Sequence, residues 1–188
     1  CTRSASKPQY IAENILARDF HAERPNEKWV TDVTEFKFYD GQDTRKLYLS
    51  AILDLFDRRI VSYVIRNRND NELVLGTLDK ALRDNPDAHP LLHSDRGFQY
   101  TSHSFHVRIQ KHGMIHSMSR VGHCIDNGPM EGFWGILKRE MYYRHIYESR
   151  NDLVNALEGY LHYYNFERLQ RRLSIMTPQE YHNHYLAA

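Results

Sequence analysis

Three strand-like segments follow one another between residues 28 and 67, and this succession limits the folds open to the chain. The segments are KWVTDVTEFKFY, KLYLSAILDLF and RRIVSYVIRN, and they are rich in Val, Ile, Thr and aromatic residues. The sequence DGQDT between the first two is typical of a turn. Because connections this short join antiparallel neighbours, we predict a three-stranded antiparallel meander.

Helices and strands alternate along the rest of the chain. DNELVLGTLDKALRDN and HSFHVRIQKHG have apolar residues at helical spacing, while HPLLHSD and MIHSMS are short apolar runs typical of buried strands. Three further helices are predicted from IDNGPMEGFWGILKRE, from SRNDLVNALEGYLHYYNFER and from the sequence that begins at TPQE. The order predicts an α/β fold with a mixed five-stranded sheet flanked by helices.

Length and composition indicate one folded domain. The chain has 188 residues, of which 41% are hydrophobic and 26% charged, and these values are typical of globular proteins. We assign residues 1–26 to a linker or N-terminal arm, with a short helical pattern between Ile11 and Leu16. Residues 27–185 form the predicted core with its C-terminal helices.

Nothing in the sequence points to a membrane or to export. No apolar run approaches the ~20 residues of a membrane span, and the first ten residues lack the apolar stretch of a secretion signal. The two cysteines, Cys1 and Cys124, supply no disulfide framework. We therefore expect a soluble protein of the cytoplasm, without a membrane partner.

Net charge does not identify a partner, so local charge must do so. The net charge is +1, which neither favours nor excludes a nucleic acid. Basic residues gather in FDRRIVSYVIRNR and ERLQRRL, where they could meet phosphates or simply cover a solvated face. They are Arg58, Arg59, Arg66, Arg68, Arg168, Arg171 and Arg172.

Three acidic residues occupy positions where a carboxylate could serve chemistry. Asp32 lies among β-formers in WVTDVTEF, where burying its charge without a partner would be costly. Asp95 stands where a strand ends at a glycine-containing turn, and Glu131 lies in the first turn of a helix. Taken singly, an outward-facing Asp32 and a turn-forming Asp95 are the simpler interpretations.

The helix that carries Glu131 has two further features. Lys138, seven residues later, shares a stripe with Glu131 beside the apolar face. Gly132 and Gly135 weaken the helix by roughly 1 kcal/mol each relative to Ala. Either a DNA backbone or a closely packed helix would account for these glycines.

Five blocks of sequence follow one another over residues 28–182: WVTDVTEF, LYLSAILDLFDRRIVSY, LLHSDRGFQYTS, SRVGHCIDNGPMEGFWGILKRE and YNFERLQRRLSIMTPQEY. In this order they resemble the DDE transposases of bacterial insertion sequences, which have a catalytic core of the retroviral-integrase type. The resemblance is to the group with two overlapping reading frames, whose second frame supplies this core. The match falls on Asp32, Asp95 and Glu131, and 35 residues separate the last two, as this group prefers.

The resemblance implies a ribonuclease H-like fold in which Asp32, Asp95 and Glu131 bind two Mg²⁺ ions, with Mn²⁺ as a substitute. Hard divalent cations prefer carboxylate oxygens, and a pair roughly 3.5–4 Å apart can activate one oxygen and stabilise the departing one. The implied reactions are cleavage of DNA at the element ends by water and strand transfer (DNA integration) by the freed 3′-hydroxyl.

The resemblance also implies partners. DNA is expected at the site, with a homo-oligomer in the synaptic complex and nucleoid association in the bacterial cytoplasm. Lys138 is implied as a DNA contact near the cleaved end. The arginines Arg96, Arg168, Arg171 and Arg172 are further candidates, although Arg96 could equally pair with Asp95. Members of this group normally carry helix-turn-helix modules before the core, so we expect such modules to lie outside this chain.

Several neighbouring residues are expected to have structural roles. Asp54 and Asp57 are interpreted as turn or structural residues, and Asp126 and Asn127 as caps of the following helix. Trp134 stands where the family commonly has Phe, and it is not expected to touch the carboxylates.

Three alternatives compete with this interpretation. A zinc site could be built from His103 and His106, or from His112, His116 and Cys124, although structural zinc usually recruits several cysteines. A non-catalytic DNA-binding remnant would not need the intact triad. A stand-alone ribonuclease H-like nuclease would share the triad and fail only to join ends.

Overall fold

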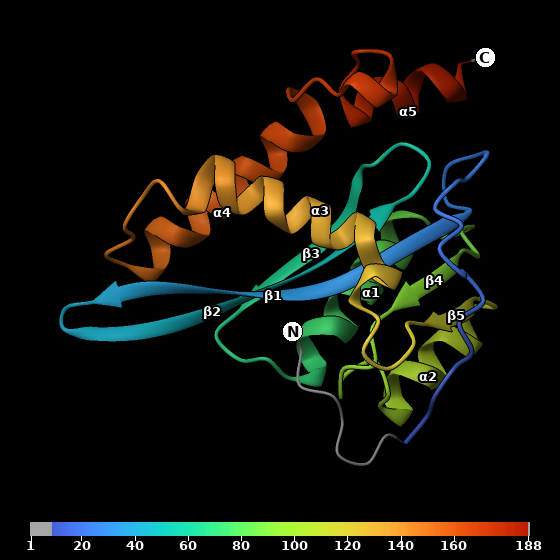
Figure 1. Ribbon diagram of the computed structural model, residues 1–188, viewed down its shortest axis with the longest axis horizontal. Helices are drawn as coiled ribbons and strands as arrows, with labels where there is room; N and C mark the ends of the chain where they lie inside the picture. Colours follow the sequence, from blue (N-terminus) through green and yellow to red (C-terminus); the bar gives the residue numbers. More distant parts are fainter. Residues whose placement is uncertain (1–8, 188) are drawn as a thin grey trace.

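A five-stranded sheet forms the centre of the computed structural model, which describes residues 9–187 apart from the side chain of Cys124 (Figure 1). The strands are β1 (Lys28–Asp40), β2 (Asp43–Asp54), β3 (Ile60–Arg66), β4 (Leu91–Ser94) and β5 (Ile115–Met118). Their order is β3-β2-β1-β4-β5, in which β1, β2 and β3 are antiparallel, β4 is parallel to β1, and β5 is parallel to β4. The predicted meander and mixed sheet are confirmed.

The long β1–β2 hairpin follows from its turn and from burial on both faces. Asp40 pairs with Asp43, so only Gly41 and Gln42 form the turn, and Gly41 has a φ of +63° that glycine adopts without strain. Trp29 and Val30 are consecutive and point to opposite faces, yet both are fully buried. Both faces of the sheet must therefore be covered.

Helices provide this cover. They are α1 (Asn71–Asp84), α2 (His103–Lys111), α3 (Gly128–Leu137), α4 (Arg150–Phe166) and α5 (Pro178–Leu186). One hydrophobic core joins α1 and α2 to the face that carries Trp29, and a second joins α3 and α4 to the face that carries Val30. None of the helices found in the described part of the chain is long and apolar enough to span a lipid bilayer.

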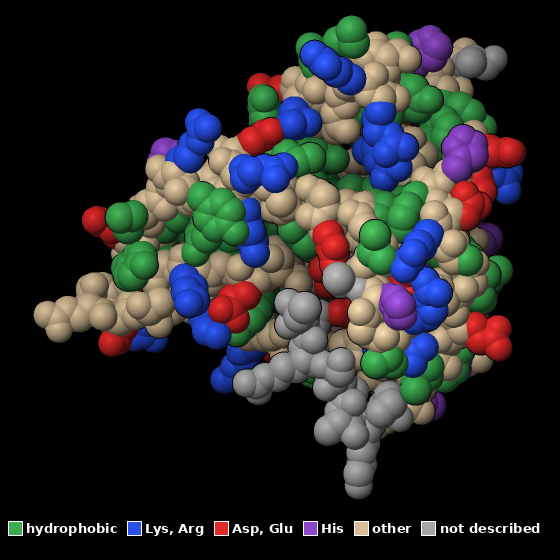
Figure 2. All heavy atoms as spheres, viewed as in Figure 1, with side chains coloured by type: hydrophobic (Ala, Val, Ile, Leu, Met, Phe, Trp, Pro, Cys, Tyr) green, Lys and Arg blue, Asp and Glu red, His purple; other side chains and the backbone are tan. Residues whose placement is uncertain are grey.

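Helix α3 lies over β1 and is extended by a short helical turn at each end (Figure 1). The 3₁₀ turn η1 (Cys124–Asn127) leads into it, and the π-helical turn η2 (Lys138–Tyr142) continues it. The same face is shown in Figure 2, where basic side chains flank acidic side chains near the centre.

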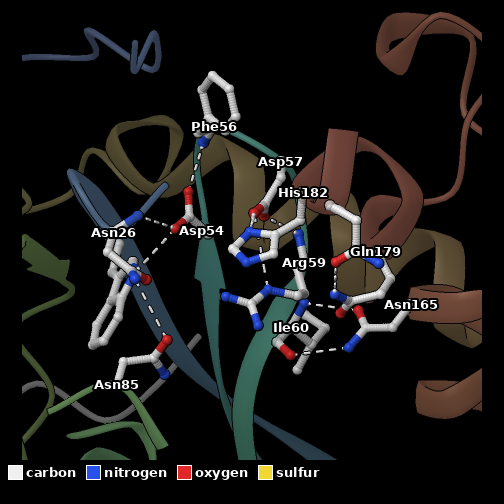
Figure 3. A network of polar contacts seen from close by, with 12 residues as sticks. Asn26, Asp54, Phe56, Asp57, Arg59, Ile60, Asn85, Asn165, Gln179 and His182 are labelled. Carbon is white, nitrogen blue, oxygen red and sulfur yellow. Dashed lines mark hydrogen bonds and ion pairs between the residues drawn. The ribbon is translucent and has the colours of Figure 1, made fainter. Parts of the chain in front are cut away.

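A buried polar network fastens α5 to the end of β2 (Figure 3). Asp57 accepts hydrogen bonds from the backbone N–H of Arg59 at 2.9 Å and from Nδ1 of His182 at 2.7 Å. Asp54 accepts the N–H of Asn26 at 2.7 Å, and burial together with the charge of Asp57 raises the pKa of Asp54 to about 7. These contacts agree with the interpretation of both aspartates as structural.

The segment before β1 packs along β5 and is not helical. The backbone N–H of Leu16 donates to Oγ of Ser117 at 2.9 Å, and the N–H of Met118 donates to the carbonyl of Glu13 at 3.1 Å. The helical pattern expected between Ile11 and Leu16 is therefore wrong. Pairing with β5 outcompetes a helix of this length, which is marginal on its own.

Candidate active site

Asp32 and Asp95 lie at matching positions of adjacent parallel strands. The register pairs Val30 of β1 with His93 of β4, and each aspartate stands two residues beyond its member of that pair. Neighbouring strands are about 4.8 Å apart, so residues at matching positions are neighbours. The structure thus brings together two of the three predicted carboxylates, where β4 ends.

The electrostatics of this pair favour a bound cation. Burial and the charge of Asp95 raise the pKa of Asp32 to about 7. The Oδ1 atom of Asp32 is buried without a hydrogen-bond partner, whereas Oδ1 of Asp95 accepts the N–H of Gly97 at 2.7 Å. A buried carboxylate oxygen without a donor is costly unless positive charge joins it.

Trp134 connects α3 to this pair. Its Nε1 donates a 3.1 Å hydrogen bond to Oδ2 of Asp32. The expectation that Trp134 does not touch the carboxylates is therefore wrong, because the indole extends from α3 to β1. The Phe common in the family has no such donor. Glu131 precedes Trp134 by three residues, nearly one helical turn, and its side chain is exposed.

The three predicted carboxylates do not form a complete metal-binding site in this structure. Among residues 9–187, leaving aside the Cys124 side chain, no three His, Cys, Asp or Glu side chains are close enough to hold a metal ion. The structure joins Asp32 and Asp95 and leaves Glu131 outside the pair. The donors are nevertheless all carboxylate oxygens, and one buried oxygen lacks a partner, so the residues fit a hard divalent cation.

Asn127 and Asp126 anchor the start of α3, whereas capping it was expected. Asn127 donates from Nδ2 to the carbonyl of Thr31 at 3.1 Å and gives α3 no side-chain cap. Asp126 is buried between Arg120 and Arg18, at 2.9 and 2.6 Å. Their hydrogen bonds, that of Arg120 foremost, hold the pKa of Asp126 well below its ordinary value. Asn127 stands at the N-cap position, but its Oδ1 accepts no hydrogen bond, and Asp126 is bound to the two arginines. The prediction that these side chains cap the helix is therefore wrong.

Lys138 contributes positive charge beside the pair. Its half-buried side chain lies with Nζ 5.3 Å from the centre of the Phe36 ring. Burial lowers the pKa of Lys138, while the carboxylates of Asp32 and Glu35 act in the opposite direction. Lys138 is therefore close enough to Asp32 to interact with its charge.

The other predicted DNA contacts differ in the hydrogen bonds and ion pairs that they already form within the protein. Arg96 donates from Nε to a backbone carbonyl at 2.8 Å. Arg168 forms a 2.6 Å ion pair with Glu140. Arg171 and Arg172 are exposed in the 3₁₀ turn η3 (Arg171–Leu173). Figure 2 shows basic side chains on both sides of the acidic side chains near the centre of this face.

Two family models match this chain, and both describe an integrase core domain. An integrase core domain matches residues 22–124, and a second integrase core domain description matches residues 131–186. The protein named as transposase InsK for insertion sequence element IS150, from Escherichia coli K12, is 44% identical over 173 residues, which are 92% of this chain and 60% of that protein. An uncharacterized transposase-like protein from Haemophilus influenzae is 42% identical over 172 residues, which are 92% of this chain and 78% of that protein.

More distant similarity extends to another insertion sequence and to viral integrases. Transposase InsF for insertion sequence IS3A of E. coli K12 is 31% identical over 179 residues, which are 94% of this chain and 61% of that protein. The HTLV-2 integrase catalytic core domain, solved in complex with magnesium, has a TM-score of 0.65 at 21% identity and covers 86% of this chain and 99% of its own. A chain of the simian T-cell lymphotropic virus intasome, solved in complex with PP2A regulatory subunit B56 gamma, gives a TM-score of 0.71 at 20% identity and covers 96% of this chain and 59% of its own.

These similarities agree with the geometry of the site. The viral structures show the fold, which is the expected ribonuclease H-like fold, and the bacterial relatives show the family. The chain spans 60% of the length of InsK. The chain belongs to the integrase core domain family, among the transposases of bacterial insertion sequences.

Proposed function

We propose that this chain supplies the catalytic core with which an insertion-sequence transposase cleaves DNA at the element ends and joins those ends to a target. The observation that carries the proposal is the buried pair of Asp32 and Asp95, in which one carboxylate oxygen lacks a hydrogen-bond partner. Two neighbouring carboxylates destabilise a fold unless a cation joins them, so such pairs are more typical of functional sites.

Asp32, Asp95 and Glu131 are the proposed ligands of two divalent cations, with Mg²⁺ as the favoured ion and Mn²⁺ as a substitute. When bound, these cations activate the attacking oxygen and stabilise the departing one. The HTLV-2 integrase core was solved in complex with magnesium, which supports the choice of ion. Because Glu131 is exposed, packing does not hold its side chain away from the pair.

Other residues of the chain position the reactants. Trp134 orients Asp32 through its hydrogen bond, and Lys138 supplies positive charge where a phosphate at the cleaved end would lie. In the first step water attacks a phosphodiester, and the bond to the 3′-oxygen breaks to give a 3′-hydroxyl and a 5′-phosphate. That hydroxyl then attacks a target phosphodiester, so one phosphodiester bond replaces another.

DNA is the proposed partner, and more than one copy of the chain is proposed to act on it. The exposed Arg171 and Arg172 are proposed to contact the backbone, together with Arg96 and Arg168, although Glu140 competes for Arg168. Two element ends need two active sites, which favours a homo-oligomer. The HTLV-2 cores were solved in dimeric and trimeric forms, which supports this proposal.

The test is Asp95→Asn, assayed with labelled duplex carrying the element ends, with Mg²⁺, and scored for cleaved and joined products. Asn keeps the size of the side chain but not its negative charge, so both products should fall by at least 100-fold, with the thermal unfolding temperature unchanged or raised. Asp87→Asn, in an exposed loop, is the control and should keep both activities.

Each other outcome has a definite meaning. Cleavage at the wild-type rate by Asp95→Asn would remove Asp95 from the site. Cleavage without joining by the wild-type chain would identify a stand-alone nuclease. Binding with neither product would identify a non-catalytic DNA-binding protein.

A further inference from the structure

A pocket at the start of α3 brings together Arg58, which has no role in the proposed active site, and Arg172, which is already proposed to contact the DNA backbone. Its volume is about 520 Å³, and it is lined by Asp19, Phe20, His21, Arg58, Gly128, Pro129 and Arg172. The acidic member, Asp19, forms a 2.7 Å ion pair with Lys28. The two arginines therefore leave the pocket with a surplus of positive charge.

Arg58 is the member that points to a ligand. Arg58 is only 6% exposed, and its Nε is buried without a hydrogen-bond partner. Burial and the nearby charge of Arg172 lower the pKa of Arg58 to about 10, against the opposing influence of Tyr164 and the two aspartates of the β2 network. A buried guanidinium N–H without an acceptor is costly, and an anion between the two arginines would remove that cost and their repulsion.

The backbone at Arg58 supports the same conclusion. Arg58 has a φ of +64°, a conformation that glycine adopts freely and that strains a residue with a Cβ. Glycine would be the more stable choice if only the turn between β2 and β3 mattered. Arg58 therefore lines the pocket although its backbone conformation destabilises the turn.

The start of α3 adds to the positive potential. Gly128 and Pro129 line the pocket, and a helix N-terminus carries a partial positive charge that attracts anions. Asn127 places no side-chain cap on this end. Helix α3 has ten residues, enough for its dipole to act.

We propose that this pocket binds a backbone phosphate of the DNA on which the candidate active site acts. The inference rests on the proposed function, because Glu131 lies in the first turn of the same helix. A phosphate held at the start of α3 fixes the strand within about one helical turn, roughly 5 Å, of Glu131. Arg58 and Arg172 make the contacts, and because they meet only the backbone they set the register of the strand and not its sequence.

Arg58→Gly and Arg172→Ala test the pocket. Glycine suits the φ of +64° and Arg172 is exposed, so both variants should fold. Arg83→Ala is the matched control, because Arg83 is an exposed arginine in the last turn of α1, on the opposite side of the sheet. Binding of a labelled duplex is measured by fluorescence anisotropy in Ca²⁺ over a salt series. Each pocket variant should weaken binding several-fold and reduce the slope of log Kd against log salt by about one, with Arg83→Ala unchanged.

A second experiment distinguishes a phosphate of the DNA backbone from free inorganic phosphate as the ligand of the pocket. Wild type and Arg58→Gly are melted with and without inorganic phosphate at constant ionic strength. If both pocket variants bind DNA with the wild-type slope of log Kd against log salt, the proposal is overturned. A phosphate-dependent rise in melting temperature that Arg58→Gly abolishes, combined with unchanged slopes, would assign the pocket to free phosphate instead. Failure of the wild-type chain to bind any DNA would overturn the proposed function together with the subsite.

Discussion

At the residue scale, the hydrogen bond from Trp134 to Asp32 joins the helical side of the site to its sheet side. It orients one carboxylate oxygen and leaves the other, which has no partner, for a cation. Loss of a residue that orients a metal ligand typically costs 10- to 100-fold in metal affinity or activity. We expect Trp134→Phe, which keeps an aromatic ring without a donor, to raise the Mg²⁺ concentration for half-maximal cleavage by about 10-fold. The rate at saturating Mg²⁺ should stay within a few-fold of wild type.

Phe133→Leu is the control for this prediction. Phe133 is the neighbour of Trp134, packs with its ring centre 4.8 Å from that of Tyr164, and has no hydrogen-bond donor. Its replacement should lower the melting temperature without moving the Mg²⁺ dependence. A Mg²⁺ dependence that Trp134→Phe leaves at the wild-type value would mean that the indole does not orient Asp32 for a metal.

The sequence predicts the positions of Asp32 and Asp95 in the sheet better than it predicts the contacts of Trp134 and Asn127. Asp32 and Asp95 can be found because strand segments and their ends are visible in the pattern of apolar residues. Trp134 and Asn127 bond to residues 102 and 96 positions away. Helical periodicity already accounts for a Trp on a buried face, and a local cap already accounts for an Asn before a helix. Neither pattern carries information about the distant partner.

At the element scale, α3 contains a glycine where nothing packs. A Cβ at Gly132 would meet no atom within 4 Å, so close packing of a second helix does not explain this residue. Alanine is more stable than glycine inside a helix by about 1 kcal/mol. We expect Gly132→Ala to raise the free energy of unfolding by about that amount and, if DNA approaches α3 here, to weaken DNA binding several-fold. Urea unfolding and fluorescence anisotropy measure the two effects.

Gly159→Ala provides the comparison in α4. Gly159 is also exposed, and a Cβ added there would meet no atom within 4 Å. The substitution should give the same gain in stability without loss of DNA binding. Stabilisation with unchanged binding in Gly132→Ala would show that the DNA backbone does not come close to this turn of α3.

Elements with strong local signals were predicted correctly, and the one with a weak signal was not. The start of α5 is visible in TPQE, and the structure contains both hydrogen bonds of the capping box, between Thr177 and Glu180, at 3.1 and 2.9 Å. The segment from Ile11 to Leu16 has a helical pattern but is too short to be stable alone. Its backbone bonds to β5 and its neighbours instead, which the local sequence does not encode.

At the scale of the whole molecule, burial of His116 in β5 links stability to pH. Its Nε2 lies 3.0 Å from Oγ of Ser94, and its ring stacks with that of Tyr10 at a centre-to-centre distance of 6.3 Å. The charges of His93 and His106 act on it as well. Burial lowers the pKa of His116 to about 3, and the charges of His93 and His106 act in the same direction. The folded protein therefore keeps this ring neutral over the range in which an unfolded chain would protonate it.

The variant His116→Gln isolates this contribution. A histidine in the unfolded chain titrates near pH 6.5, so below that pH the unfolded state binds a proton that the folded state does not. The stability contributed by neutral His116 is thus complete above pH 6.5 and is lost as the pH falls toward 3. The raised pKa values of Asp32 and Asp54, about 7, act in the opposite direction in both proteins and cancel in the difference. Between pH 7 and pH 5 the free energy of unfolding, measured by urea titration, should fall by about 2 kcal/mol more in wild type than in His116→Gln. Parallel curves for the two proteins would show that His116 is protonated equally in the folded and unfolded states.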